Sequence, residues 1–300
     1  MSPTLATRPR PKRFPQMTDR LPLGQTGLVT SPFCVGWVQD PSVVEAAFDA
    51  GVNFFFLTTD MHWPVYEGIR RGLAALLRRS SGVRDQIVVA ATSYVTQPDF
   101  TYAPFVELLE AVPELQRIDV LVIGGAYGHE FATRHPIYQQ HLRSGRFGAR
   151  ALGTTFHDRA AAIDAINQAQ VDLAFVRCNP VHPGARSDLF PKLRPSPTRV
   201  FNFNSMIGYT RPAALAAHGI TADHWRPRPT DYYRFALSQR GVEGLLCSLH
   251  HPREVRALER ALRQPLLDDE EQRYMIDLAS LVGGTMRLAD APAGKRRARP

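Results

Sequence analysis

The regular alternation of short apolar runs with amphipathic stretches is the feature that most constrains the fold of this 300-residue chain. Its clearest example is Asn53–Leu57 (NFFFL), an aromatic run bounded by Gly51 and by a polar turn. Short runs without charged residues are typical of strands covered on both faces, as in parallel sheets and barrels. Such folds place their chemistry just beyond the carboxyl ends of the strands. Asp60 and His62, which follow this run, are therefore candidates for a functional site.

Seven further apolar runs complete the pattern. We expect strands at Pro32–Val38, Ile87–Thr92, Ile118–Ile123, Ala149–Thr155, Leu173–Cys178, Val200–Asn204 and Gly244–Ser248. Helical patterns separate most of them, at Pro41–Ala50, Ala103–Leu115, Ile137–Arg143, Ala160–Gln168, Tyr232–Gln239 and Pro252–Leu262. Eight such units predict an α/β fold of the (β/α)8 TIM barrel type. An open, doubly wound sheet is the alternative, but the first strand is not followed by the glycine-rich turn that such sheets usually carry.

Both ends of the predicted barrel carry additions. Leu21–Ser31 reads as an N-terminal β-hairpin that caps one end of the barrel, and Asp269–Leu281 as an extra C-terminal helix outside it. The formal charge of +8 at pH 7 is concentrated in the two ends of the chain, so no nucleic-acid partner is expected for the nearly neutral body. We expect a disordered basic tail at 1–20, one barrel domain at 21–285 and a second disordered basic tail at 286–300.

Cysteine usage and hydropathy bear on the compartment. Cys34, Cys178 and Cys247 lie far apart, without the spacing of a disulfide framework or a zinc site. No apolar segment of signal-peptide length opens the sequence, and no run approaches the roughly eighteen apolar residues that cross a bilayer. We therefore expect a cytoplasmic protein without a membrane partner. The abundance of Arg, Ala and Pro is typical of bacteria with GC-rich genomes.

Several stretches resemble the aldo-keto reductases. They are Leu23–Leu28 (LGQTGL), Ala46–Phe55 (AAFDAGVNFF) and Arg84–Thr92 (RDQIVVAAT). Arg177–Pro191 (RCNPVHPGARSDLFP) and Thr230–Ser238 (TDYYRFALS) are similar to motifs of a divergent bacterial branch of that superfamily. The resemblance covers residues 21–281 and implies an aldo-keto reductase type of barrel.

The resemblance also implies a catalytic tetrad of Asp, Tyr, Lys and His, which protonates a carbonyl while NAD(P)H delivers hydride. The corresponding positions hold Leu57, His62, Ser93 and Gly124 in this chain. The likeness therefore predicts that the reductase tetrad is lost. Without the Lys and the Asp, the proton donor would lack the groups that lower its pKa.

The cofactor site implied by the resemblance is retained in part. The candidates for cofactor binding are Thr155, Asn179, Phe203, Asn204, Ser248 and Arg253. Phe156 and Phe175 stand where the family holds the nicotinamide amide with polar groups, which would turn that region into an apolar cavity. No cofactor is therefore required by the sequence, although NADPH binding is compatible with it.

The polar side chains at the predicted strand ends suggest acid-base chemistry. His62 can exchange a proton near neutral pH, with Asp60 orienting it and Tyr94 assisting. Asp60 and His62 could instead be loop residues that begin the next helix. Cys178 and His157 could form a thiolate-imidazolium pair, although a free cysteine is more often a small buried hydrophobe. No metal site is predicted, because no ligand pair has the required spacing on one element.

These observations favour a divergent aldo-keto-reductase-like enzyme that catalyses non-hydride acid-base chemistry as a lyase, isomerase, cyclase or dehydratase. Its partner would be a small carbonyl-containing molecule, such as an intermediate of specialised metabolism. One alternative is an NAD(P)H-dependent oxidoreductase in which His62 replaces the tetrad Tyr. Another is a regulatory protein that binds the nucleotide without turnover. The sequence makes no prediction of oligomeric state.

Overall fold

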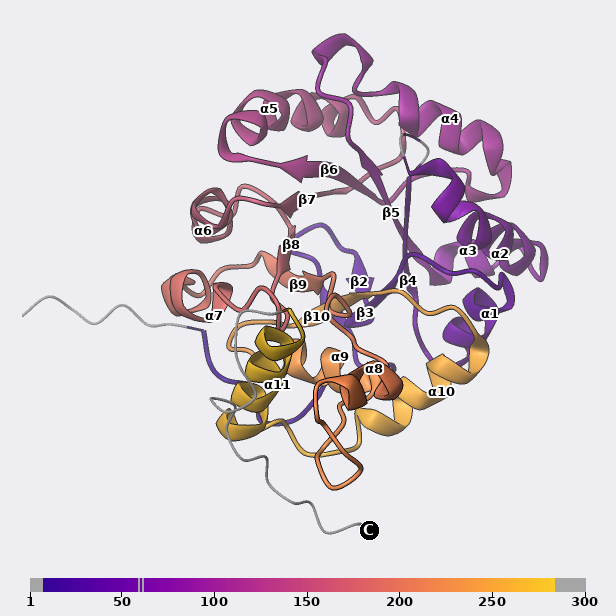
Figure 1. Cartoon of the computed structure of the whole chain (residues 1–300). Coiled ribbons are helices and arrows are strands. Elements are labelled where there is room, and N and C mark those ends of the chain that lie inside the picture. Colours follow the sequence, from indigo (N-terminus) through magenta and orange to yellow (C-terminus); the bar gives the residue numbers. More distant parts are fainter. Residues whose placement is uncertain (1–7, 59, 61, 284–300) are drawn as a thin grey trace, which may run out of the picture.

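The computed structural model of the chain describes residues 8–58, 60 and 62–283. At its centre, eight parallel strands close into a barrel (Figure 1). Neighbours around the barrel follow in chain order: β3 (Phe33–Val35), β4 (Phe54–Thr58), β5 (Val88–Ser93), β6 (Val120–Ala126), β7 (Ala151–Phe156), β8 (Leu173–Arg177), β9 (Arg199–Phe203) and β10 (Gly244–Cys247). The barrel closes because β10 pairs with β3. The predicted (β/α)8 barrel is confirmed, and the open sheet is excluded.

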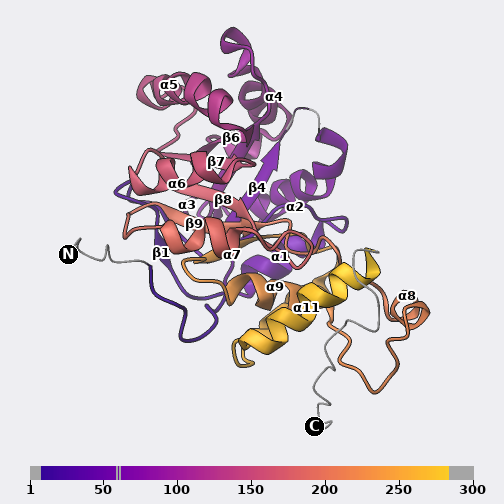
Figure 2. The ribbon, with the colours of Figure 1, turned by 60° about the vertical axis from the view of Figure 1, so that its left-hand side comes forward.

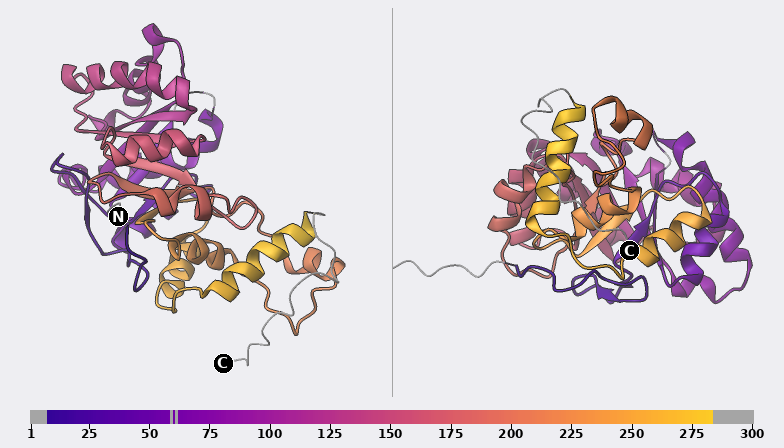
Figure 3. Two further views of the ribbon diagram at one scale, coloured as in Figure 1. Left: turned by 90° about the vertical axis from the view of Figure 1, so that its left-hand side faces the viewer. Right: turned by 60° about the horizontal axis from the view of Figure 1, so that its bottom comes forward.

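Helices surround the barrel. They are α1 (Ser42–Asp49), α2 (Glu67–Arg78), α3 (Val83–Gln86), α4 (Ala103–Ala111), α5 (Gly128–Ser144), α6 (Arg159–Asn167), α7 (Ala185–Asp188), α8 (Pro212–Ala217), α9 (Pro229–Leu237), α10 (Pro252–Ala261) and α11 (Asp269–Val282). The predicted extra helix is α11, which lies outside the barrel in the neighbourhood of α8 (Figures 2 and 3). Leu215 of α8 and Leu278 of α11 share a small apolar cluster there. Among the described helices, none has the length and apolar character needed to span a bilayer.

Alternation along each strand divides the core into two layers. Side chains that point inward fill the barrel, and phenylalanines dominate this filling: Phe56 meets Phe175 at 5.5 Å between ring centroids, and Phe54 meets Phe201 at 5.8 Å. Side chains that point outward pack under the helices, as Phe55 and others do. Every residue of β4 is consequently buried, as expected of a strand covered on both faces.

The predicted hairpin is present and closes the amino-terminal end of the barrel. Its strands are β1 (Leu21–Pro22) and β2 (Val29–Thr30), which pair in antiparallel fashion. Leu23 and Leu28, in the turn between them, are buried against the inner layer of the barrel. This cap leaves the carboxyl ends of the strands as the accessible mouth.

Residues 8–20 differ from the predicted disordered tail. Phe14 and Met17 are buried in the outer core, and the Arg8 guanidinium bonds the carbonyl of Thr198 and the carboxylate of Glu243. The disordered tail was predicted from the number of basic residues in this segment. The two apolar side chains instead determine where the segment packs. The remainder of both predicted tails, 1–7 and 286–300, lies outside the described residues, as do Thr59 and Met61.

Two helical regions also differ from the prediction. Helix α5 begins at Gly128, well before the expected Ile137, and contains Pro136 in its interior. It continues through the proline because Phe131, Arg134 and Tyr138 bury one face. The segment 208–228, in which the sequence predicted no helix, contains the short helix α8.

Candidate functional site

The candidate residues of the barrel mouth stand where the inward-facing rows of neighbouring strands end. Asp60 follows β4, Tyr94 follows β5 and His157 follows β7. Each is an even number of residues beyond an inward-facing side chain of its strand, so the alternation carries it toward the barrel axis. The structure thus brings together side chains that lie about 100 positions apart in the sequence.

Asp60 ties the end of β4 to the end of β5. Its Oδ1 accepts a hydrogen bond from the Thr58 hydroxyl at 2.8 Å, and its Oδ2 accepts one from the backbone N–H of Tyr94 at 2.5 Å. Both carboxylate oxygens therefore hold strand ends. In this geometry Asp60 positions Tyr94, a role that the sequence did not suggest.

His62 and Tyr94 form a contact pair at the mouth. Their rings meet edge to face, with centroids 4.8 Å apart and planes at 88°. Burial and the negative charge of Asp60 together raise the pKa of Tyr94 to about 12, against the opposing effect of the buried Arg134 guanidinium. The Tyr94 hydroxyl therefore stays protonated at neutral pH, where it can donate a hydrogen bond.

A glycine separates Tyr94 from His157. Gly125 lies at a register irregularity near the end of β6 and has φ +63°, and a Cβ built there would meet Tyr94 at 3.2 Å and His157 at 3.8 Å. His157 in turn contacts Phe203 and Tyr127, with ring centroids 5.9 and 5.6 Å away. Burial lowers the pKa of His157, and the positive charge of Arg177 lowers it further. A row of aromatic and imidazole rings thus lines one side of the mouth.

Tyr66 is a mouth residue that the sequence analysis missed. It ends the short 3-10 helix η1 (Trp63–Tyr66) and packs on the inner layer of the barrel, with its ring 6.2 Å from that of Phe56. Burial raises its pKa strongly. The available signal was a tyrosine in the loop after the second barrel strand, directly before α2.

The other three positions that correspond to the reductase tetrad, Leu57, Ser93 and Gly124, do not contribute side chains to the row of rings at the mouth. Leu57 points outward into the helix layer. Ser93 is fully buried, and its carbonyl oxygen and that of Gly124 accept hydrogen bonds from Arg134, at 2.6 and 2.8 Å. Arg134 itself is buried, and its Nε has no hydrogen-bond partner. The guanidinium therefore holds the ends of β5 and β6 together from behind the mouth.

Cys178 does not fit the predicted nucleophilic role. Its side chain is fully buried in the outer layer of the core, and burial raises the pKa of its thiol to about 12. His157, by contrast, is an exposed residue that contacts aromatic rings at the mouth. A thiolate needs an electropositive and accessible setting, so the structure supports the small buried hydrophobe instead.

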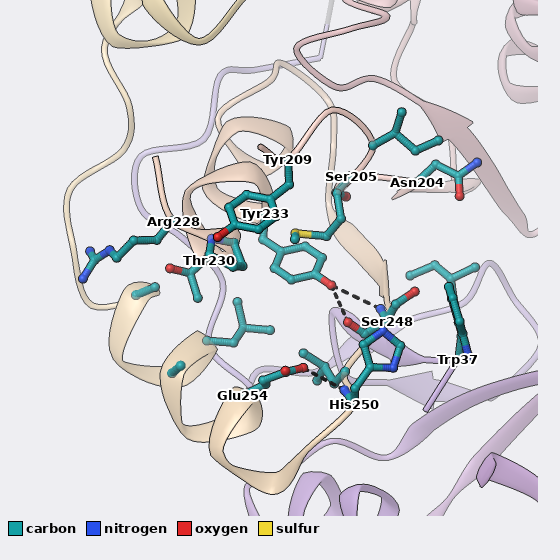
Figure 4. A pocket seen from close by; sticks show the side chains of 18 of the residues that line it. Trp37, Asn204, Ser205, Tyr209, Arg228, Thr230, Tyr233, Ser248, His250 and Glu254 are labelled. Carbon is teal, nitrogen blue, oxygen red and sulfur yellow. Dashed lines mark hydrogen bonds between the residues drawn. The ribbon is translucent and has the colours of Figure 1, made fainter. Parts of the chain in front are cut away.

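A large pocket opens beside the mouth, at the carboxyl ends of β9 and β10 (Figure 4). Its volume is about 1050 Å³. Its walls are the segment after β9, the start of α9, the loop after β10 and one face of α10. The residues that line it include Trp37, Asn204, Arg211, Arg228, Ser248, His250 and Arg260.

The pocket wall offers unpaired polar groups. Arg211 and Arg260 form no ion pair with any described residue, whereas Arg228 lies 3.7 Å from the Asp231 carboxylate. The Nδ1 atom of His250 is buried without a hydrogen-bond partner, and burial lowers the pKa of that imidazole. A buried ring nitrogen without a partner is costly unless a ligand or water satisfies it. The wall is thus basic and incompletely satisfied.

The predicted cofactor residues divide between the pocket, the mouth and the rim. Asn204 and Ser248 line the pocket. Thr155 accepts a hydrogen bond from the Gly125 N–H at 2.6 Å. Asn179 is fully buried and joins two loops through the carbonyl of Asn204 and the amide of His182. Phe203 packs in the barrel beside the mouth, and Arg253 is exposed one helical turn before the lining residue Ala257.

Metal ligation has no support in the described part of the chain. No three His, Cys, Asp or Glu side chains there lie close enough to hold a metal ion. The three cysteines are free and buried.

Comparison with known proteins shows which solved structures share this fold. No protein-family model matches the chain, and no curated protein matches it. Among solved structures, the glycerol dehydrogenase of Gluconobacter oxydans aligns with a TM-score of 0.62 at 14% identity, over 88% of this chain and 95% of that one. A Pseudomonas aeruginosa protein provisionally assigned to the aldo-keto reductases aligns with a TM-score of 0.56 at 16% identity, over 83% of this chain and 98% of that one. The chain therefore has the fold of the aldo-keto reductases, with the barrel, the hairpin and the outer helices that its sequence resembled.

Proposed function

We propose that this protein is an NAD(P)-dependent oxidoreductase that binds the nucleotide in the pocket beside β9 and β10 and a small carbonyl compound, or the matching alcohol, at the barrel mouth. The observation that carries the proposal is the pocket itself. It has the volume for an extended ligand, an unsatisfied His250 ring nitrogen and two arginines without ion pairs. Both structural neighbours bear names from the same class of reaction, which agrees with the proposal.

The residues present fit a dinucleotide. Arg211 and Arg260 can bind phosphate oxygens, for which a planar guanidinium is well suited. The acidic residue of the pocket wall is Glu254, in the first turn of α10, whose carboxylate accepts a hydrogen bond from the His250 N–H. Trp37 and Asn204, which follow β3 and β9, line the pocket near the strand ends and would border a nicotinamide ring bound there. When bound, the nucleotide supplies or accepts the hydride.

Residues of this chain would bind the substrate oxygen and transfer its proton. Tyr94 stays protonated because its pKa is about 12, and it can hold the substrate oxygen by a hydrogen bond. His62, whose ring contacts that of Tyr94, is the candidate proton carrier. Asp60 fixes the backbone of Tyr94. We infer that this arrangement replaces the tetrad, since Ser93 and Gly124 present no ionisable side chain.

The first experiment is a titration of the purified protein with NADPH and NADH, followed by nicotinamide fluorescence and thermal shift. Nucleotide at 100 times its Kd would stabilise the fold by about 2.7 kcal/mol. Arg260→Gln should weaken binding about tenfold or more, because it removes a charge-assisted contact, while Arg143→Gln on α5 serves as a matched control. No binding at millimolar nucleotide would refute the oxidoreductase.

A second candidate is the non-hydride acid-base enzyme. It is favoured because Ser93 and Gly124 stand at two of the tetrad positions. Among the described residues, the cation at the ends of β5 and β6 is Arg134, which lies behind the mouth and not beside a proton donor. This enzyme would turn over a carbonyl substrate without nucleotide, and His62→Gln would abolish that activity. A regulatory protein would bind nucleotide with no turnover that depends on His62. The free cysteines support a reducing compartment such as the bacterial cytoplasm for any of the three.

A further inference from the structure

Arg177 brings a cation to the barrel mouth that the proposed reaction does not use. Leu173 and Phe175 of β8 point into the barrel, so the alternation directs Arg177 inward as well. In the sheet register it lies opposite Phe203 of β9. Because Thr155 of β7 pairs with Phe175, the next inward positions, His157 and Arg177, stand side by side.

A second imidazole lies on the loop that follows β8. His182 pairs with Asn179 across a short bridge, where the Asn179 Oδ1 atom accepts the His182 N–H at 2.8 Å and lies 3.3 Å from its Nδ1. The charge of Arg177 lowers the pKa of His182 and of His157, in each case in addition to the effect of burial. Both imidazoles are therefore within electrostatic reach of the guanidinium.

Within residues 8–58, 60 and 62–283, no carboxylate forms an ion pair with this cluster. Asp158 lines the same small cavity as His157 and Arg177, but its Oδ1 accepts hydrogen bonds from the backbone N–H groups that begin α6. Glu130 acts on His157 through its charge alone. A half-buried arginine without a counter-ion is a position where an anionic ligand gains most, because the cation is already partly desolvated. The cluster also lies close to the reacting groups, because only Gly125 separates His157 from Tyr94.

We propose that the substrate of the mouth carries an oxyanion, a carboxylate or a phosphate, which Arg177 binds together with His157 and His182. The guanidinium forms paired hydrogen bonds to the anion, and the imidazoles add donors. The proximity of His157 to Tyr94 across Gly125 favours a substrate whose anion lies close to its carbonyl, as in a 2-oxo acid. The substrate class rests on the proposed oxidoreductase function, but the anion subsite does not.

The test compares benzoylformate with its neutral methyl ester, which has the same carbonyl and ring. Binding is followed by the NMR titration of the His157 and His182 ring protons, with and without saturating NADP+. Benzoylformate should raise the pKa of both imidazoles and bind at least about tenfold more tightly than the ester. Arg177→Gln should remove this preference, Arg177→Lys should restore part of it, and Arg143→Gln should leave it unchanged. Benzoylphosphonate distinguishes a tetrahedral oxyanion from a planar one.

The outcomes separate this proposal from the preceding one. Selective binding of either anion by a protein that binds no NADPH or NADH at millimolar concentration would support the subsite and refute the oxidoreductase. Reduction of the ester and the acid with equal kcat/KM, or an unchanged preference in folded Arg177→Gln, would overturn the subsite. Equal binding of acid and ester in both nucleotide states would overturn it as well. The thermal midpoint of each variant verifies that it is folded.

Discussion

Substitution of Asp60 separates the two roles that its carboxylate can have. Asn can keep both hydrogen bonds: its carbonyl oxygen accepts from the Tyr94 N–H, and its amide donates to the Thr58 hydroxyl, which can also accept. Asp60→Asn therefore removes the charge and retains the geometry. Asp60→Ala removes both and leaves the Tyr94 N–H without a partner.

The magnitudes follow from these contacts. A hydrogen bond to a charged group contributes about 1.5–3 kcal/mol and a neutral one about 0.5–1.5, so Asp60→Asn should cost about 1–1.5 kcal/mol per bond. Asp60→Ala should cost more, about 3–6 kcal/mol, because both bonds are lost and the Tyr94 N–H is left unsatisfied. The loss of the negative charge should lower the pKa of Tyr94 in both variants, since Asp60 contributes to its rise.

Urea unfolding of the two variants measures the stability difference, and NMR of labelled tyrosine measures the pKa of Tyr94. If Asp60 only positions Tyr94, the turnover of Asp60→Asn should stay within about threefold of the wild-type value while that of Asp60→Ala falls much further. Equal destabilisation by the two substitutions would refute this reasoning about hydrogen bonds. A loss of turnover in Asp60→Asn as large as in Asp60→Ala would show instead that the charge acts on His62.

Further predictions concern stability and the mouth. Asp119→Ala should lower the free energy of unfolding by about 3–5 kcal/mol, measured by urea denaturation, because it leaves a buried arginine without its partner. Tyr66→Phe should change that free energy by less than about 1 kcal/mol but reduce kcat/KM, since its hydroxyl bonds no described residue and faces the mouth. The pKa values of His157, His182 and His250 are lowered in the folded state, so the unfolded state binds more protons below about pH 6.5. Stability should therefore fall as the pH drops through 6.5, and replacement of the three by Gln should flatten the urea midpoint measured between pH 7.5 and 5.

The barrel could be predicted from the sequence because its signals are local. Each buried strand is a short apolar run, and Asn53–Leu57 is identified by composition alone. Helix α5 shows where this reasoning fails. Pro136 suggests a helix boundary, but burial of one face outweighs the missing hydrogen bond. The prediction for residues 8–20 was wrong for a similar reason, because their packing depends on contacts with distant parts of the chain such as Glu243.

The candidate site was predictable in part. The sequence placed Asp60, His62 and Tyr94 at one end of the barrel because strand ends must converge there. It did not show which atoms Asp60 holds, nor that Tyr66 folds over the barrel, because both depend on turn geometry that includes a 3-10 helix. The pocket beside β9 and β10 could not be predicted for a different reason: its arginines come from a long loop and from one face of α10, with no motif that links them.

The closure of the barrel has a consequence for folding and binding together. Strands β3 and β10 are about 210 positions apart, and their pairing brings Trp37 against His250, with ring centroids 4.9 Å apart. The pocket is built across this seam, so it exists only after the first and last strands have joined. Contacts of such long range form late and carry the largest loop-closure cost. A ligand bound in the pocket would therefore hold the first and last strands together, and it would slow the separation of β3 from β10 more than the opening of other parts of the barrel.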